Sequence, residues 1–246
     1  VVTLTYNRLD VRTAINAALR RDLNAAWERF RDDEDAWVGI VTGAGGSFCA
    51  GADMQDAGGS AGTWPGSFWE IPTINSYESG LEVWKPTIAA VNGYCLGYGL
   101  TLVTRCDFVI AADDAQFGFP EVRLGVPTIV GALRLPDRVG WSNAMELLLT
   151  GDRVDAERAL EMGLAWKVVP RARLMDEART LADRLLQAAP LAARATKEVA
   201  ARGRHLPWME AVRFGETMRR VAAGTEDSSE GLAAARERRP PEWRGR

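Results

Sequence analysis

Alternating hydrophobic and polar positions open the chain. Val2, Leu4 and Tyr6 are separated by threonines, and this spacing predicts a half-buried strand. Between residues 13 and 32 the apolar residues recur at the period of a helix, which predicts an amphipathic helix. The other strands predicted in this half of the chain are at 37–42, 87–91 and 107–112.

The second half of the chain is predicted to be mostly helical. Two helices begin at Ser142 and Asp155, whose side chains can cap a helix N-terminus, and they end at Gly151 and Gly163. A short strand is predicted at 166–169, and four further helices are predicted at 173–188, 190–202, 207–223 and 227–238. An alternating part over about 1–170 thus precedes a helical tail, which predicts an α/β fold.

The composition is that of a globular protein with one sizeable core. The 246 residues are 47% hydrophobic and 26% charged, with a formal net charge of −3. This near-neutral balance argues against nucleic acid as a partner. The most apolar stretch, 87–103, is interrupted by Asn92 and glycines, so it indicates buried core and no membrane span. The three cysteines lie far apart without C-x-x-C spacing, which favours reduced thiols and a cytoplasmic protein.

The sequence also disfavours several kinds of active site. His205 is the one histidine, which excludes a multi-histidine metal site and disfavours Ser-His or Cys-His catalysis, so no metal is expected. Ser47, with Gly45 before it and Cys49 after it, does not complete a G-x-S-x-G motif. Residues 54–80 are rich in Gly, Ser and Pro and carry Trp64, Phe68 and Trp69. This pattern fits a functional loop and a surface excursion equally well.

Two small-residue turns stand out, at 47–54 and 91–99. Each follows a predicted strand, and the second leads into a predicted helix at 100–105. Two such turns can aim two backbone N–H groups at one point, where they would stabilise negative charge on an oxygen. The alternative is that the glycines serve tight turns for steric reasons alone. A dinucleotide site is disfavoured, because residues 93–99 have G-x-x-x-G-x-G spacing instead of G-x-G-x-x-G.

Glu121 is the candidate acid/base residue. It lies among Phe117, Phe119, Val122 and Leu124. Apolar neighbours desolvate a carboxylate and raise its pKa towards values that suit proton transfer. The alternative is a glutamate that begins a helix or forms an ion pair with a neighbouring arginine.

Several motifs, in order along the chain, resemble those of the enoyl-CoA hydratase/isomerase superfamily, the crotonases. Residues 48–54, F-C-A-G-A-D-M, are similar to its F-x-A-G-A-D-[ILM] element. Residues 85–93, K-P-T-I-A-A-V-N-G, followed by G-Y-G at 97–99, resemble its second oxyanion segment. The P-E pair at 120–121 and the segments 149–153 and 225–231 continue the match, so the resemblance covers nearly the whole chain.

The resemblance implies a ββα-spiral core with a CoA thioester site over 1–190. It implies a C-terminal helical region over 191–246 that forms a homotrimer or a hexamer. The backbone N–H groups of Ala52 and Tyr98 would bind the thioester oxygen, and Glu121 would act as acid/base. Coenzyme A enters only as part of the substrate, and no other cofactor is implied. The residues implied to contact the substrate are Arg12, Ala50, Asp53, Met54, Gly97 and Thr101.

Three features depart from the pattern of the family's hydratases. Such enzymes usually carry two glutamates, and Thr101 stands in place of the first; its hydroxyl is not a base near neutral pH. Tyr98 stands where the family more often has glycine. Three roles are open for its phenol: it lines the acyl pocket, it acts as an acid, or it only packs against neighbouring side chains. Residues 125–132 are poorer in glycine than in hydratases, which predicts a reshaped acyl pocket.

These departures favour isomerase-like or atypical hydratase chemistry with one carboxylate. Two alternatives stay open. Water positioned by Thr101 would permit a hydratase or dehydratase reaction, and the missing glutamate also permits a CoA-binding scaffold with little catalysis. Hydrolase activity is disfavoured, because Thr128 occupies the neighbourhood of the additional acid that such relatives carry.

Overall fold

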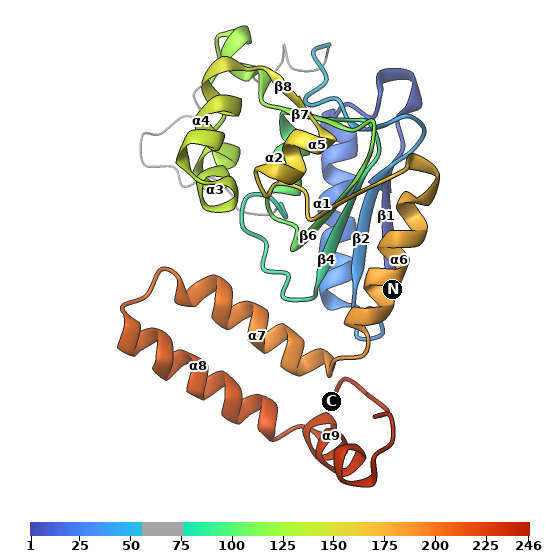
Figure 1. The fold of residues 1–246 in the computed structure, drawn as a ribbon, viewed down its shortest axis with the longest axis vertical. Coiled ribbons are helices and arrows are strands. Elements are labelled where there is room, and N and C mark those ends of the chain that lie inside the picture. Colours follow the sequence, from blue (N-terminus) through green and yellow to red (C-terminus); the bar gives the residue numbers. More distant parts are fainter. Residues whose placement is uncertain (56–75) are drawn as a thin grey trace.

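The computed structural model describes residues 1–55 and 76–246, and these form two sheets surrounded by helices (Figure 1). The larger sheet is parallel and has the order β1-β2-β4-β6-β9. Its strands are β1 (Val2–Tyr6), β2 (Gly39–Gly43), β4 (Thr87–Val91), β6 (Phe108–Ala112) and β9 (Lys167–Val169). The smaller sheet has the order β3-β5-β7-β8, with an antiparallel last pair. Its strands are β3 (Ser47–Cys49), β5 (Tyr94–Leu96), β7 (Gln116–Gly118) and β8 (Arg153–Asp155).

The chain crosses repeatedly from the larger sheet to the smaller one. β2 leads into β3, β4 into β5, and β6 into β7. The second crossing is followed by helix α2 (Tyr98–Val103) and the third by the 3-10 segment η3 (Pro120–Leu124). This repeat winds as a spiral and brings equivalent turns to the same edge. Two crossings touch at Gly93, which has a φ of +82° and where a Cβ would lie 2.1 Å from the Gly46 oxygen, so only glycine fits.

Helices cover both faces of the larger sheet. α6 packs on one face, where Leu174, Ala178 and Leu181 meet apolar side chains of β2, β4 and β6. On the other face, α1 buries Leu23, Trp27 and Phe30 in the main core. The helices other than α2 are α1 (Ala17–Asp32), α3 (Val130–Val139), α4 (Trp141–Thr150), α5 (Ala156–Glu161), α6 (Leu174–Leu185), α7 (Pro190–Gly203), α8 (Trp208–Ala223) and α9 (Glu226–Glu237), with 3-10 segments η1 (Leu9–Val11) and η4 (Arg171–Arg173).

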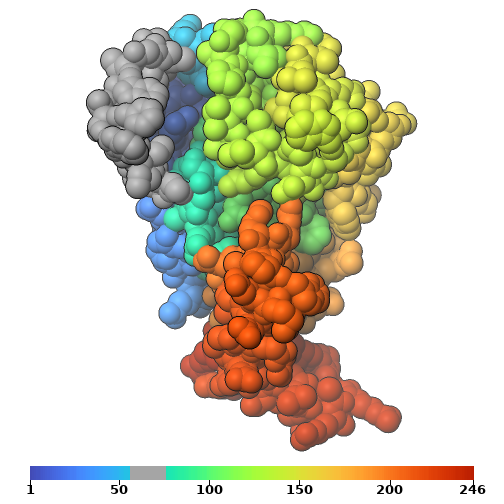
Figure 2. All heavy atoms as spheres, turned by 90° about the vertical axis from the view of Figure 1, so that its left-hand side faces the viewer, coloured from blue at the N-terminus to red at the C-terminus, as the bar shows by residue number. Residues whose placement is uncertain are grey.

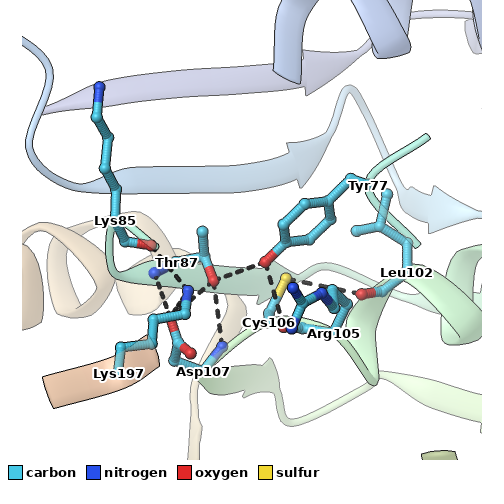
Figure 3. A network of polar contacts seen from close by, with 8 residues as sticks. All are labelled: Tyr77, Lys85, Thr87, Leu102, Arg105, Cys106, Asp107 and Lys197. Carbon is cyan, nitrogen blue, oxygen red and sulfur yellow. Dashed lines mark hydrogen bonds and ion pairs between the residues drawn. The ribbon is translucent and has the colours of Figure 1, made fainter. Parts of the chain in front are cut away.

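The C-terminal helices project from the spiral core. Figure 2 shows α7 to α9 as a narrower extension beneath it. A polar network joins α7 to the core (Figure 3): the Lys197 ammonium donates to the Asp107 carboxylate at 2.7 Å and to the Lys85 carbonyl at 2.8 Å. The same Asp107 carboxylate accepts hydrogen bonds from the Thr87 N–H and hydroxyl, at 2.7 and 2.9 Å. Burial lowers the pKa of Lys197, while the Asp107 carboxylate favours its charged form.

Most predicted elements are confirmed, including the strands at 2–6 and 87–91 and the α/β character. The first helix, however, begins at Ala17 and not at residue 13. Asn16 caps it by accepting a hydrogen bond from the Leu19 N–H at 2.9 Å. Arg12 and Thr13 adopt left-handed φ values of 52° and 57°, because the buried Thr13 hydroxyl donates to the Phe48 carbonyl at 2.7 Å. A tertiary contact thus overrides the helical periodicity.

Two further predictions need correction. The helix predicted to begin at Ser142 starts at Trp141, with Gly140 as its N-cap, so Ser142 lies inside the first turn. Asp155, in contrast, caps α5 as predicted, since its side chain accepts from the Arg158 N–H at 2.8 Å. The smaller sheet was not predicted, because three-residue strands are too short to show a period of two. Most of the loop predicted at 54–80 lies outside the described residues.

Candidate active site

The two glycine turns of the sequence lie against each other. Parallel pairing of β3 with β5 aligns the strands that lead into them. A Cβ at Gly99 would lie 2.6 Å from the Cys49 Cβ, and one at Gly51 would lie 3.4 Å from the Leu96 oxygen and 4.0 Å from the Gly97 Cα. The distance at Gly99 leaves no room for a side chain, and Gly51 has a φ of +99°, which favours glycine. The backbones therefore approach each other closely, as the small residues predicted.

The N-terminal segment 12–15 holds the first turn in place. The Ile15 N–H donates to the Gly51 carbonyl at 2.8 Å, and the Asp53 N–H donates to the Ile15 carbonyl at 2.9 Å. These bonds flank Ala52 without using its N–H group, as in a parallel bridge. Among residues 1–55 and 76–246, the Ala52 N–H has no acceptor.

The second turn leads directly into α2. Gly97 is the N-cap, with a φ of 52° and a ψ of −115°, and offers no side chain to cap the helix. Tyr98 is the first helical residue, where a backbone N–H has no partner inside the helix. Within the described part of the chain, the Tyr98 N–H meets no acceptor. Each turn therefore leaves one donor unused where the two turns meet.

Glu121 lies beside this junction. A Cβ at Gly97 would be 3.0 Å from the Glu121 Oε1 and 3.5 Å from its Cδ, so the carboxylate occupies the space next to Gly97. The other oxygen, Oε2, is buried and has no partner among the described residues. Burial raises the pKa of Glu121, while its own backbone N–H and the nearby Thr128 hydroxyl favour the ionised form. The expectation of a partly desolvated carboxylate is confirmed.

Thr101 and Tyr98 lie on the same short helix as this junction. The Thr101 N–H donates to the Gly97 carbonyl at 2.9 Å, which places the threonine one turn further along α2, buried with 8% of its surface exposed. The Tyr98 side chain is half-buried, and the Arg20 guanidinium lies 5.0 Å from the centre of its ring. Burial, followed by the neighbouring Glu78 carboxylate, raises the pKa of the Tyr98 phenol.

The remaining predicted substrate contacts gather around the first turn. The Ala50 N–H donates to the Arg12 carbonyl at 3.1 Å, and the Arg12 guanidinium lies 5.5 Å from the centre of the Tyr94 ring. The Asp53 carboxylate pairs with Arg8 at 2.9 Å. Met54 is exposed at 67%. The structure thus brings Arg12, Ala50 and Asp53 together around the first turn, whereas Thr101 lies on α2.

Sequence reasoning missed Glu78, a buried carboxylate with 5% of its surface exposed, whose charge contributes to the raised pKa of the Tyr98 phenol. The residue falls at the end of the Gly-, Ser- and Pro-rich stretch 54–80, where composition predicts a loop and attention goes to its aromatic residues. Neither its spacing nor its neighbours signal burial.

In the part of the chain that the structure describes, no group of three or more His, Cys, Asp or Glu side chains is arranged to hold a metal ion. No helix there is long and apolar enough to cross a membrane.

Comparison with known proteins identifies the family. The model of the enoyl-CoA hydratase/isomerase family matches residues 1–246. The (E)-benzylidenesuccinyl-CoA hydratase of Thauera aromatica is 36% identical over 100% of this chain and 96% of that protein. The carnitinyl-CoA dehydratase of Proteus mirabilis is 39% identical over 95% of this chain and 91% of its own. The crystal structure of an enoyl-CoA hydratase from Mycobacterium tuberculosis H37Rv superimposes with a TM-score of 0.90 at 35% identity, over 100% of this chain and 96% of that one, which confirms the expected crotonase-like fold. The chain belongs to the enoyl-CoA hydratase/isomerase family.

Proposed function

We propose that this protein processes acyl-CoA thioesters through an enolate, with Glu121 as the acid/base. One observation supports the proposal: the turns that carry the unpartnered N–H groups of Ala52 and Tyr98 lie against each other, and the Glu121 carboxylate lies beside Gly97 in the second turn. Removal or addition of a proton next to a thioester places negative charge on the carbonyl oxygen. A site with two N–H donors and one carboxylate supplies what that step needs.

In the proposed reaction the thioester oxygen accepts hydrogen bonds from Ala52 and Tyr98. Each donor of this kind is worth about 3 kcal/mol in the transition state, because it is already aimed at the developing charge. Glu121 then removes a proton from a carbon next to the thioester or its vinylogue, and returns it to the same or another carbon. Arg12, near the first turn, is the proposed partner of the CoA phosphates. The main chain around Ala50 would hold the pantetheine arm.

Two reaction outcomes fit this site. A single carboxylate suffices to move a double bond, and Thr101 supplies no second base, which favours isomerase-like chemistry. The relatives of the chain, however, carry the names of hydratases and dehydratases, which favours addition or removal of water. Hydration by one carboxylate requires that another group hold the water, and Thr101 is the group that the sequence predicts.

Incubation in heavy water with short, medium and aryl enoyl-CoAs separates these outcomes. Mass spectrometry distinguishes deuterium incorporated at carbon from the addition of a whole water molecule. Deuterium without water indicates an isomerase, and both together indicate a hydratase. If neither occurs with any thioester of the panel, the protein is a CoA-binding scaffold and the proposed function is wrong.

The pH dependence of proton exchange tests the role of Glu121. The carboxylate must be ionised to remove a proton, so kcat/KM for exchange falls as the pH drops through its pKa. Because burial raises this pKa above 4.5, the acid limb lies above that pH. The Thr128 hydroxyl favours the ionised form, so we expect Thr128→Val to move the limb upward. Thr128→Ser, which keeps the hydroxyl, should leave it in place. A limb that moves downward in Thr128→Val would contradict this assignment.

The proposed assembly is a homotrimer or a dimer of trimers formed through α7 to α9. The residues of α8 are exposed or half-buried in one chain, with Trp208, Met209 and Val221 exposed at 78%, 61% and 65%. Exposed apolar side chains of this size favour burial against another surface. We expect sedimentation to give the mass of a trimer or hexamer, and a stable monomer would refute the assembly.

A further inference from the structure

The first turn of the site lies against a strained segment of the chain, residues 8–15. Within this segment Arg12 and Thr13 have φ values of 52° and 57°, a left-handed conformation that residues other than glycine rarely adopt. Two such residues in succession persist only where surrounding contacts hold them, and conformations of this kind cluster at functional sites. Contacts with the first turn therefore fix the shape of segment 8–15.

The main chain of this segment flanks Ala52 on both sides. The Ile15 N–H donates to the Gly51 carbonyl at 2.8 Å, and the Ile15 carbonyl accepts the Asp53 N–H at 2.9 Å. Ala52 itself is exposed, and its N–H has no acceptor among the described residues. The direction of the Ala52 N–H thus depends on how segment 8–15 holds the two residues beside it.

Arg8 joins this segment to the turn through one side-chain nitrogen. The Arg8 Nη1 carries two hydrogens, and it donates to the Ala14 carbonyl at 2.7 Å and to the Asp53 carboxylate at 2.9 Å. The exposed fractions of the side chains are 27% for Arg8 and 11% for Asp53. Ion pairs that are partly buried in this way are screened by salt much less than exposed ones. Arg8 therefore holds the Ala14 carbonyl and the Asp53 carboxylate close together.

The contacts of Asp53 indicate a role inside the turn. Its Oδ2 accepts the hydrogen bond from Arg8, and its Oδ1 accepts the Gln55 N–H at 3.1 Å. Both carboxylate oxygens are thus engaged by groups of the protein on either side of the turn. This arrangement favours a carboxylate that shapes the turn over one that contacts the substrate, the role that the family resemblance implies for Asp53.

We propose that Arg8 and Asp53 are positioning residues that aim the Ala52 N–H at the thioester oxygen. Both act through the main chain, and neither side chain touches the reacting atoms. An oxyanion donor contributes fully only when it points at the oxygen as negative charge develops there. A small rotation of the peptide that carries the Ala52 N–H therefore slows enolate formation. This inference rests on the proposed function and adds to it the groups that direct one of the two donors.

Arg8→Met and Asp53→Ala test this role in the full chain. Each removes one partner of the ion pair. We expect kcat for deuterium exchange at the α-carbon of a saturated acyl-CoA to fall about 100-fold, with KM changed less than about twofold, well below the unfolding midpoint of each variant. The double variant should be no slower than either single one, because the two side chains act as one unit. Asp53→Asn, which keeps an oxygen acceptor for Arg8, should recover part of the rate.

The infrared stretch of the bound thioester carbonyl, isotopically labelled in the saturated acyl-CoA, gives a second measurement that does not depend on turnover. Hydrogen bonds from the two turns polarise the carbonyl and lower its stretching frequency relative to that of the free thioester. A misdirected Ala52 N–H weakens this effect. In Arg8→Met and in Asp53→Ala the frequency should therefore move back towards that of the free thioester, which the loss of an ion pair elsewhere in the protein would not cause.

Glu177→Gln is the matched control. It removes the ion pair between a partly buried glutamate of α6 and Lys167 of β9, and it should leave kcat, KM and the carbonyl frequency unchanged. Unchanged kcat in both single variants, a rise in KM alone, additive single effects or an unmoved carbonyl frequency would overturn the inference and leave the proposed function standing. A wild type that neither exchanges deuterium nor lowers the carbonyl frequency would refute both. If one single variant does not fold, the other decides the question.

Discussion

Glu121→Gln is expected to slow every reaction of this protein, including deuterium exchange at the α-carbon, by about 10²- to 10⁴-fold. The amide keeps the shape of the side chain but cannot take up a proton near neutral pH. Because the Glu121 carboxylate occupies the space next to Gly97, the substitution removes the proposed base from the junction of the two turns. The measurement is single-turnover exchange in heavy water, followed by mass spectrometry. Glu157→Gln, at an exposed position on α5, is the control and should exchange at the wild-type rate.

The same substitution should stabilise the fold near neutral pH. A carboxyl group with a raised pKa in the folded state binds its proton more tightly there than in the unfolded chain. Its ionisation therefore reduces stability as the pH rises from 4.5 through the raised pKa, and the neutral amide escapes this loss. Reduced activity together with an unchanged or higher unfolding midpoint would support a catalytic role. Unchanged exchange in Glu121→Gln would refute the proposed function.

Gly99→Ala is expected to lower activity about 10²- to 10³-fold, the effect of losing one oxyanion donor. The added Cβ would lie 2.6 Å from the Cys49 Cβ and 3.2 Å from the Cys49 carbonyl oxygen, so the two turns must move apart. Alanine suits a helix better than glycine, and the backbone of Gly99 is helical, so the expected effect comes from the steric contact alone. Overpacking of this kind costs about 1–3 kcal/mol of stability, which urea unfolding measures.

Gly46→Ala provides the control for this experiment. Gly46 lies in the loop that leads into β3, and a Cβ there would meet nothing within 4 Å. The variant should keep both its activity and its unfolding midpoint. If Gly99→Ala retained wild-type activity, the spacing between the turns would not matter, and the proposed pair of backbone donors would lose its support.

The larger sheet and most helices were predictable because their signals are local. The runs at β1 and β4 and the helical periodicity of α1 reflect burial on one face of an element, which the sequence records directly. The caps at Asn16 and Gly140 were not predicted, since several residues near each helix start satisfy the same preference. The choice among them depends on contacts such as that of Thr13 with the Phe48 carbonyl.

The candidate site was predictable to the extent that it depends on backbone. Glycines at 51, 97 and 99 indicate close approach, and apolar neighbours of Glu121 indicate desolvation, so both features follow from residue types. Glu78 carries no such signal, because its burial results from the anchoring of Tyr77 between β4 and the end of α2.

The amino-acid sequence by itself determined the family, the larger sheet and the identity of the lone glutamate at the junction of the turns. Tertiary structure alone decided that the two turns touch, that three-residue strands pair into a second sheet, and that a second carboxylate, Glu78, is buried. The physical reason is range: periodicity and turn chemistry act over a few neighbouring residues, whereas the pairing of β3 with β5 and the burial of Glu78 depend on residues that only folding brings together.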